Sequence, residues 1–136
     1  MSFLHEHRVG FADVDPAGIV FYPRYFEMIN ATIENWFRAI GYGFDEMIIQ
    51  DRFGVPTATI QVDFKAPSRL DDLLEFRLDL KRLGRSSIGI EITISGDDEI
   101  RALVQQTLVF IRIDGNKPAR IPDPLRARIE RSMEAN

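Results

Sequence analysis

Residues 23–40 read "PRYFEMINATIENWFRAI", the longest helical pattern in this chain. Apolar residues recur here every three or four positions, which places them on one face of an α-helix. This stripe comprises Tyr25, Phe26, Ile29, Ile33, Trp36, Phe37 and Ile40. Pro23 suits the first helical position, and Gly41 suits a helix stop. We therefore predict a helix of roughly 25 Å with one apolar face that must be covered.

Strict alternation of apolar and polar residues after this helix predicts strands that are buried on one face only. These strands are expected over residues 57–65, 73–82 and 87–95, with a fourth over 101–113 after the turn "GDDE". In the first of them, the residues expected to face the core are Ala58, Ile60, Val62 and Phe64. Such one-sided strands indicate an antiparallel sheet, and only one long helix is available to cover it. The sequence therefore predicts an α+β domain whose sheet curls around a buried helix.

Two shorter elements are expected at the ends of the chain. A short strand around "EHRVGFA", residues 6–12, precedes the long helix. Residues 123–134 are expected to form a final helix, with Asp123 as its N-cap and Pro124 in its first position. No repeat or linker divides the sequence, so residues 1–136 are predicted to form a single domain.

The composition is that of an ordinary globular protein, with 45% hydrophobic and 28% charged residues. Cysteine is absent, which excludes disulfides, thiolate metal sites and a cysteine nucleophile, and fits a reducing cytoplasm. The N-terminal residues lack a signal-peptide pattern, and no apolar run approaches the length of a membrane span. The net charge of −4 argues against a nucleic-acid partner. We expect a cytoplasmic protein with neither a membrane nor a nucleic-acid partner.

Most catalytic motifs are missing. The sequence has no nucleophile elbow, no P-loop and no Gly-x-Gly-x-x-Gly fingerprint. Its only histidines, His5 and His7, are interpreted as residues of a half-exposed strand face, and they are too few for a histidine-based zinc site. No metal is therefore expected. The remaining catalytic groups are carboxylates, backbone amides and hydroxyls.

The loop before the helix supplies such groups. Asp15 precedes Pro16, which stiffens the turn, and Gly18 permits a tight turn or close approach to a ligand. The backbone amides near Phe21 and Tyr22 lie at the helix start, where developing negative charge is stabilised. A carboxylate beside such amides can serve acyl transfer. From these residues alone, a solvated turn that caps the helix remains an alternative.

A thioester is the substrate class that tolerates so few catalytic groups. Its carbonyl is electrophilic, and its leaving thiol has a pKa of about 8.5, so departure requires little acid assistance. One carboxylate, acting as general base or as nucleophile, would then suffice.

The stretch "FADVDPAGIVFYPRYFE", residues 11–27, with the helix and strands around it, resembles the hotdog-fold acyl-CoA thioesterases. It is most similar to the 4-hydroxybenzoyl-CoA thioesterase group, whose pattern is Asp-x-Asp-Pro-Ala-Gly-(Ile/Val)-x-x-Tyr-Pro-x-Tyr. The resemblance implies a five-stranded antiparallel sheet wrapped around a long central helix. Tol–Pal-associated thioesterases usually carry His where this chain has Tyr22, which favours the 4-hydroxybenzoyl-CoA-like branch.

The resemblance also implies roles for individual residues. Asp15 would be the catalytic carboxylate, the N–H of Tyr22 would polarise the thioester carbonyl, and Asp13 would support them. Family members need no cofactor, since coenzyme A is part of the substrate. They assemble by edge-to-edge strand pairing into homodimers or homotetramers, with sites at subunit interfaces.

Further residues are candidates for substrate binding. The basic turn in "KRLGRSSI", residues 81–88, would hold the coenzyme A phosphates. The candidates are Arg82, Arg85, Ser86 and Ser87 of this turn, Thr57 and Thr59 across the interface, Gly18, and Phe21, Tyr25 and Phe44 around the acyl group. Read from the residues alone, the alternatives are an exposed turn for the basic residues, strand formers for the threonines and core residues for the aromatics.

The predicted function is hydrolysis of an acyl- or aroyl-CoA thioester to the free acid and coenzyme A. A helix carboxylate, Glu27 or Glu34, is an alternative catalytic group, although their charged neighbours favour a solvated face. Two alternative functions are a hotdog hydratase or dehydratase and a non-catalytic acyl-CoA-binding module.

Overall fold

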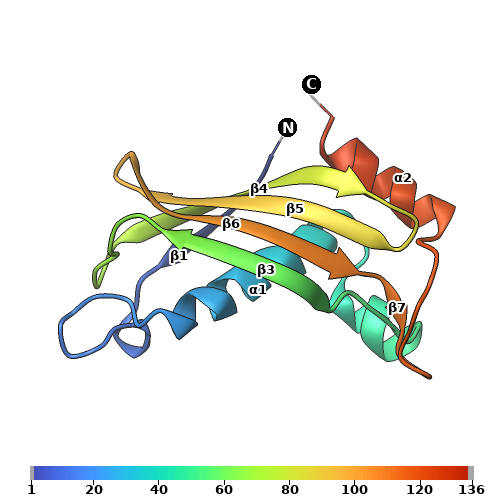
Figure 1. Cartoon of the computed structure of the whole chain (residues 1–136), viewed down its shortest axis with the longest axis horizontal. Coiled ribbons are helices and arrows are strands. Elements are labelled where there is room, and N and C mark those ends of the chain that lie inside the picture. Colours follow the sequence, from blue (N-terminus) through green and yellow to red (C-terminus); the bar gives the residue numbers. More distant parts are fainter. Residues whose placement is uncertain (1, 135–136) are drawn as a thin grey trace.

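The computed structural model describes residues 2–134, and its long sheet curls around one helix (Figure 1). The strands of this sheet are β1 (Phe3–Arg8), β3 (Thr57–Phe64), β4 (Leu73–Leu83), β5 (Ser87–Gly96) and β6 (Glu99–Val109). The helices are α1 (Pro23–Ala39) and α2 (Asp123–Ser132), with a short 3-10 helix η1 (Phe11–Asp13) and a π-helix η2 (Asp45–Gln50). A second, small sheet contains β2 (Phe53–Gly54), β7 (Ile111–Arg112) and β8 (Lys117–Pro118).

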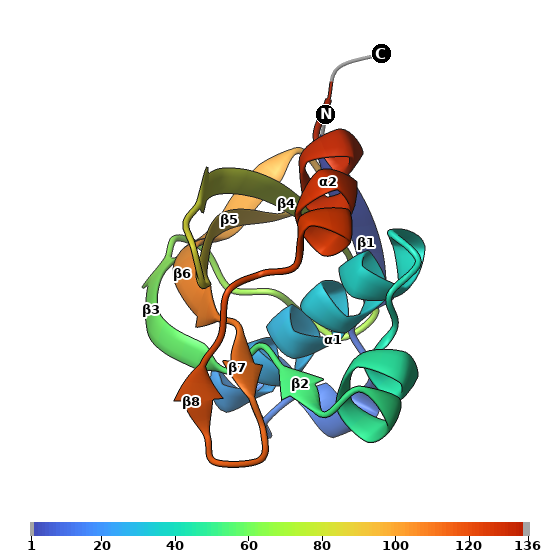
Figure 2. The ribbon, with the colours of Figure 1, turned by 90° about the vertical axis from the view of Figure 1, so that its right-hand side faces the viewer.

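The large sheet has the strand order β1-β4-β5-β6-β3, and every neighbouring pair is antiparallel. Figure 2 shows α1 on the concave side of this sheet. Trp36 and Phe37 of α1 are fully buried, as are Phe76 and Ile92 of the sheet. The architecture confirms the predicted α+β hotdog arrangement, in which the apolar stripe of the long helix forms the centre of the core.

The turn "GDDE" forms the predicted hairpin between β5 and β6. Its two loop residues, Asp97 and Asp98, have positive φ angles of 49° and 60°. A two-residue loop with two positive φ angles follows the right-handed twist of the flanking strands. The hairpin therefore sets the register of β5 against β6.

The prediction that strand β3 buries its apolar face is wrong for most of that strand. Ile60 is 38% and Phe64 47% exposed, and Ala58 is exposed as well. Strand β3 is an edge strand that pairs with β6 alone, whereas α1 lies nearest to β1 and β4. The helix therefore leaves the inner face of this far edge largely uncovered.

Several elements were not predicted. Strands β2 and β8 contain two residues each, too few to show a period, and the π-helix η2 lies between the predicted elements. The single strand predicted over 101–113 is wrong at its end, because β6 stops at Val109 and β7 belongs to the small sheet. Strand β1 begins at Phe3, earlier than expected. The final helix begins at Asp123 with Pro122 as N-cap, one residue before the predicted position. None of the helices within residues 2–134 has the length and apolar character needed to cross a membrane.

Candidate functional site

The loop before α1 folds back on itself as a small hairpin. Asp13 accepts a backbone hydrogen bond from the Phe21 N–H at 2.9 Å, and the Asp15 N–H donates to the Ile19 carbonyl at 3.0 Å. Gly18 closes the turn with φ +80°, and its N–H donates to the Asp15 carbonyl at 2.9 Å. These bonds place Asp15 opposite Ile19, four residues before α1 begins.

The carboxylate of Asp15 is half-buried and has one oxygen in use. Its Oδ1 accepts the Ala17 N–H at 2.8 Å, a local turn bond that fixes the side chain. Its Oδ2 has no hydrogen-bond partner among residues 2–134. One oxygen therefore positions the carboxylate, and the other is available to a water molecule or a substrate.

One backbone amide at the start of α1 is also available. The Phe21 N–H is occupied by Asp13, and Pro23 has no N–H. The N–H groups of Arg24 and Tyr25 donate to the carbonyls of Phe21 and Tyr22, at 2.8 Å and 3.1 Å. The Tyr22 N–H has no partner in the described part of the chain. Of the two amides considered from the sequence, only that of Tyr22 is therefore available to an oxyanion.

Asp13 has a supporting position, and the sequence did not reveal its partner. Its Oδ2 lies 2.8 Å from His7 Nε2 and accepts the Gly10 N–H at 2.9 Å. Partial burial opposes ionisation, but the Gly10 N–H and His7 together hold the pKa of the Asp13 carboxyl below its usual range. The Asp13 carboxylate therefore connects β1 to the loop through its contacts with His7 and Gly10.

A cleft of about 310 Å³ lies beside the start of α1 and is lined in part by Ile19, Tyr22, Tyr25 and Phe64. Tyr25 is only 4% exposed, and its hydroxyl donates to the Ser68 Oγ at 2.9 Å. The Phe21 ring is half-exposed and packs edge-on against the Tyr22 ring, with centroids 5.7 Å apart. Tyr25 therefore lines this cleft from the core, whereas Phe21 lies at the surface.

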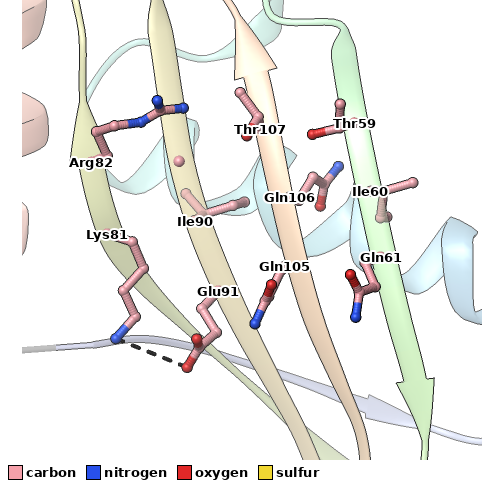
Figure 3. Close-up of a pocket in the computed structure, with 11 residues that line it drawn as sticks. Thr59, Ile60, Gln61, Lys81, Arg82, Ile90, Glu91, Gln105, Gln106 and Thr107 are labelled. Carbon is pink, nitrogen blue, oxygen red and sulfur yellow. Dashed lines mark ion pairs between the residues drawn. The ribbon is translucent and has the colours of Figure 1, made fainter.

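Another cleft, of about 550 Å³, crosses the large sheet over β3, β6, β5 and β4 (Figure 3). Two predicted substrate residues, Thr59 and Arg82, lie on its wall. Lys81 and Glu91 form an ion pair of 3.9 Å in the same cleft. Its lining is polar, and none of the residues of the loop before α1 belongs to it.

The residues predicted to form the site lie near opposite ends of strand β3 within one copy of the chain. Phe64, at one end of β3, has its ring 6.5 Å from the Tyr22 ring, beside the loop that carries Asp15. Thr57 begins β3 at the other end, where its partner strand β6 also pairs with the start of β5. The eight residues of β3 separate these ends by roughly 25 Å. Figure 1 shows the turn between β4 and β5 at the Thr57 end.

The turn itself presents two free cations. Arg82 and Arg85 are exposed, and neither side chain forms an ion pair with a carboxylate within residues 2–134. Ser86 and Ser87 are half-buried, and their carbonyls accept the N–H groups of Phe110 and Gly84 at 2.6 Å and 2.8 Å. The backbone of this turn is therefore fixed while its arginine side chains reach into solvent.

Thr57 and Phe44 line a third cleft, of about 360 Å³, between α1 and the small sheet. The Thr57 hydroxyl accepts a hydrogen bond from Gln106 Nε2 at 2.8 Å. The buried Gln106 Oε1 has no hydrogen-bond partner among residues 2–134. The candidate acyl residue Phe44 is therefore separated from the cleft that Tyr22 and Tyr25 line.

The alternative carboxylates on α1 have solvated positions. Glu27 is exposed and pairs with Arg24 at 3.1 Å, and Glu34 pairs with Arg38 at 3.1 Å. Each pair is one helical turn apart on the same face. This arrangement agrees with the interpretation of both glutamates as residues of a solvated helix face.

Comparison with known proteins places this chain in one family. The model of the Thioesterase-like superfamily matches residues 9–129. The 1,4-dihydroxy-2-naphthoyl-CoA hydrolase of Synechocystis sp. is 26% identical over 130 residues, which cover 94% of each chain. The 4-hydroxybenzoyl-CoA thioesterase of Pseudomonas sp. is 27% identical over 130 residues, covering 90% of this chain and 92% of that one. A crystal structure of a thioesterase superfamily protein from Jannaschia sp. has a TM-score of 0.90 and 28% identity, covering 98% of this chain and 94% of its own.

Proposed function

Because the chain belongs to the Thioesterase-like superfamily and is a thioester hydrolase, we propose that it cleaves an acyl- or aroyl-CoA to the free acid and coenzyme A. The observation that carries the mechanism is the pair of unoccupied polar groups beside the start of α1. These are the Asp15 Oδ2 and the Tyr22 N–H. The Asp15 Oδ2 can deliver the nucleophile, and the Tyr22 N–H can bind the carbonyl oxygen of the thioester as it becomes negatively charged.

Asp15 acts through its free oxygen in one of two ways. As a nucleophile it attacks the thioester carbonyl and displaces the thiolate, which forms an anhydride that water then hydrolyses to the free acid. As a general base it takes a proton from the water molecule that attacks the carbonyl. The bond between Oδ1 and the Ala17 N–H holds the carboxylate in place during this step. A correctly placed general base contributes roughly 10²- to 10⁴-fold to a rate. The thiolate leaves without a proton donor because its pKa is about 8.5.

The Tyr22 N–H stabilises the oxyanion of the tetrahedral intermediate. It lies at the positive end of the α1 dipole, where neighbouring amides are already bonded and Pro23 offers no competing donor. One such donor contributes roughly 3 kcal/mol to the reduction of the barrier.

Asp15→Asn tests this assignment. The amide oxygen still accepts the Ala17 N–H, so the variant should fold like the wild type while losing the base or nucleophile. We expect kcat for aryl-, short- and long-chain acyl-CoA, measured by thiol release, to fall by roughly 10²- to 10⁴-fold. Activity undiminished in Asp15→Asn would refute the mechanism. Tight binding of coenzyme A without turnover of any thioester would instead indicate a binding module.

We further propose that two copies of the chain complete each site. The open edge of β3 has unpaired backbone groups along its length, which a second β3 can pair. Antiparallel pairing about a two-fold axis brings the Thr57 end of the partner's strand to the Phe64 end of this one. The basic turn with Arg82 and Arg85 then approaches the loop of the other copy, where it can hold the coenzyme A phosphates.

Complementation between two inactive variants tests this arrangement. One variant carries Asp15→Asn, and the other carries Arg82→Ala with Arg85→Ala. After the two are unfolded and refolded together, half of the dimers are mixed, and each mixed dimer has one intact site of two. The mixture should regain about a quarter of wild-type activity. If each chain holds a complete site, the mixture will be no more active than the mean of its parents.

The proposed reaction assigns no step to a metal or an organic cofactor. We predict that the protein is cytoplasmic and that it forms a homodimer or a homotetramer. Sedimentation at several protein concentrations measures the assembly directly.

A further inference from the structure

Arg101 is the most deeply buried cation among the described residues that form ion pairs, and its surroundings connect it to the loop of Asp15. It is 5% exposed, and its position follows from an irregularity in the sheet. Ile94 pairs with Ala102, and Ser95 pairs with Ile100, so Arg101 is left without a partner on β5. A bulge of this kind redirects the side chain of the extra residue.

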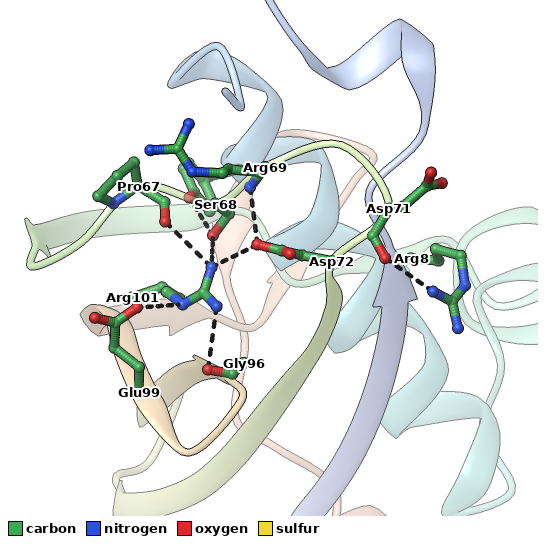
Figure 4. Close-up of polar contacts among 10 residues, drawn as sticks. Arg8, Pro67, Ser68, Arg69, Asp71, Asp72, Gly96, Glu99 and Arg101 are labelled. Atoms are coloured by element: carbon green, nitrogen blue, oxygen red, sulfur yellow. Dashed lines mark hydrogen bonds and ion pairs between the residues drawn. The ribbon is translucent and has the colours of Figure 1, made fainter. Parts of the chain in front are cut away.

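The guanidinium holds three separate parts of the chain (Figure 4). Its Nη1 donates to the Pro67 carbonyl at 3.1 Å, to the Ser68 Oγ at 3.2 Å and to the Asp72 carboxylate at 2.8 Å. Its Nη2 donates to the Gly96 carbonyl at 3.1 Å, and its Nε lies 3.1 Å from the Glu99 carboxylate. Residues 67–72 therefore receive three of these contacts, and we call them the bracing segment.

The bracing segment holds the loop of Asp15 through its backbone. The Val20 N–H donates to the Ser68 carbonyl at 2.8 Å, and the Leu70 N–H donates to the Gly18 carbonyl at 3.2 Å. On its other side, the Val9 N–H donates to the Asp72 carbonyl at 2.8 Å. The segment thus lies between Val9, which follows β1, and the turn that follows Asp15.

A side-chain contact reaches α1 from the same segment. Ser68 is fully buried, and its Oγ accepts hydrogen bonds from both Arg101 and the Tyr25 hydroxyl. The Arg101 guanidinium, and then the Arg69 N–H, hold the pKa of Asp72 below its usual range, against a smaller effect of burial. Asp72 therefore stays ionised, and the contact with Arg101 persists under ordinary conditions.

We propose that Arg101 is a positioning residue for thioester hydrolysis, which fixes the bracing segment and thereby the distance between the Asp15 carboxylate and the Tyr22 N–H. This inference rests on the proposed function of those two groups. Arg101 makes no contact with either of them, so its effect passes through Ser68 and Leu70. Small displacements of reacting groups are costly in rate, whereas the contacts of Arg82 and Arg85 with the coenzyme A phosphates do not depend on Arg101.

Two variants probe this role. Arg101→Lys keeps the charge but loses the fork that reaches Gly96 and the bracing segment together. Gly96→Ala keeps the arginine but places a Cβ 3.0 Å from its Nη2 and 3.2 Å from its Cζ, and also 3.1 Å from Leu74 Cδ2. Gly96→Ala is the milder substitution, and it is used if Arg101→Lys does not fold. Ile129→Val is the control, because Ile129 is fully buried in α2 and belongs neither to the bracing segment nor to the loop.

The measurements are kcat, KM and hydrogen exchange of individual amides by NMR. We expect both test variants to lower kcat by about 10- to 100-fold with little change in KM. The Val20 and Leu70 amides should exchange faster, while the Ile92 amide in the middle of the sheet keeps its protection. Ile129→Val should alter neither kcat nor the exchange of Val20 and Leu70.

Wild-type kcat in either folded test variant would overturn the proposal, as would unchanged exchange of the Val20 and Leu70 amides. An equal fall of kcat in Ile129→Val would show that general destabilisation is the cause and would also overturn it. Asp15→Asn is measured alongside. If that variant keeps wild-type kcat, the proposed function fails, and amide exchange still decides whether Arg101 fixes the loop.

Discussion

Asp13 and Asp15 are two residues apart, and the contacts of Asp13 predict that it contributes to stability rather than to chemistry. Asp13→Ala removes the hydrogen bonds from the Gly10 N–H and from His7. Hydrogen bonds to a charged group contribute about 1.5 to 3 kcal/mol each, and the 18% exposure of this side chain places both near the lower value. The expected loss is therefore about 3 kcal/mol of unfolding free energy.

This loss converts into a measurable change in melting temperature. The unfolding entropy of 136 residues, at about 2.1 cal/mol/K per residue, is roughly 0.3 kcal/mol/K. Asp13→Ala should therefore melt about 10 °C below the wild type at pH 7. Asp15→Asn, which keeps its turn bond, should melt within about 2 °C of the wild type. Protein concentration must be equal throughout, because self-association raises the melting temperature.

Acid provides a second test of the same contacts. The pKa of Asp13 is lower in the folded than in the unfolded chain, so its contribution to stability is complete above the ordinary aspartate pKa of about 3.9. That contribution disappears as pH falls through the folded value. The difference in unfolding free energy between wild type and Asp13→Ala, from urea titrations between pH 5 and pH 3, should therefore shrink. A difference that stays constant, or equal melting temperatures at pH 7, would refute the reasoning.

Three other substitutions have defined outcomes. Gly18→Ala places a side chain at φ +80°, which costs about 1–2 kcal/mol although the space for a Cβ is empty; we expect a lower melting temperature and a lower kcat. Tyr25→Phe removes the buried bond to Ser68 and should cost about 1 kcal/mol in urea unfolding, while a loss above 3 kcal/mol would contradict the geometry. Asp98→Gly relieves φ 60° in the hairpin loop and should stabilise the chain by about 0.5–1 kcal/mol; a lower melting temperature would contradict this expectation.

Much of the fold was predictable because its elements are long and periodic. The stripe of α1 extends over 17 residues, and each of the strands β4 and β5 repeats its alternation over ten or more. Elements of two residues have no period, which explains why β2 and β8 were missed and why β7 was not separated from β6. The exposure of β3 depends on which strand becomes the edge of the sheet, and no alternation within β3 contains that information.

The candidate site was also predictable only in part. The sequence indicated Asp15 and the start of α1, because a stiff Asp-Pro turn before a helix is a local pattern. It gave no sign that His7 would meet Asp13, or that Arg101 would be buried. His7 and Asp13 are only six residues apart, but they meet because the chain turns between β1 and η1. The burial of Arg101 depends on a bulge, and Arg101 by itself resembles any charged residue of a strand. The separation of Asp15 from Arg82 likewise follows only from the order and direction of the strands in the sheet.

The shape of the hairpin before α1 depends on backbone hydrogen bonds, and this has a consequence for the divergence of specificity among related enzymes. Neither Ala17 nor Ile19 contributes a side-chain hydrogen bond to the loop, because both act through the main chain. Ile19 also lines the cleft beside Tyr22. Under the proposed function, exchanges at that position can therefore alter which acyl group is accepted while the backbone of the hairpin is inherited unchanged. A small library at this position is a direct way to search for new substrates.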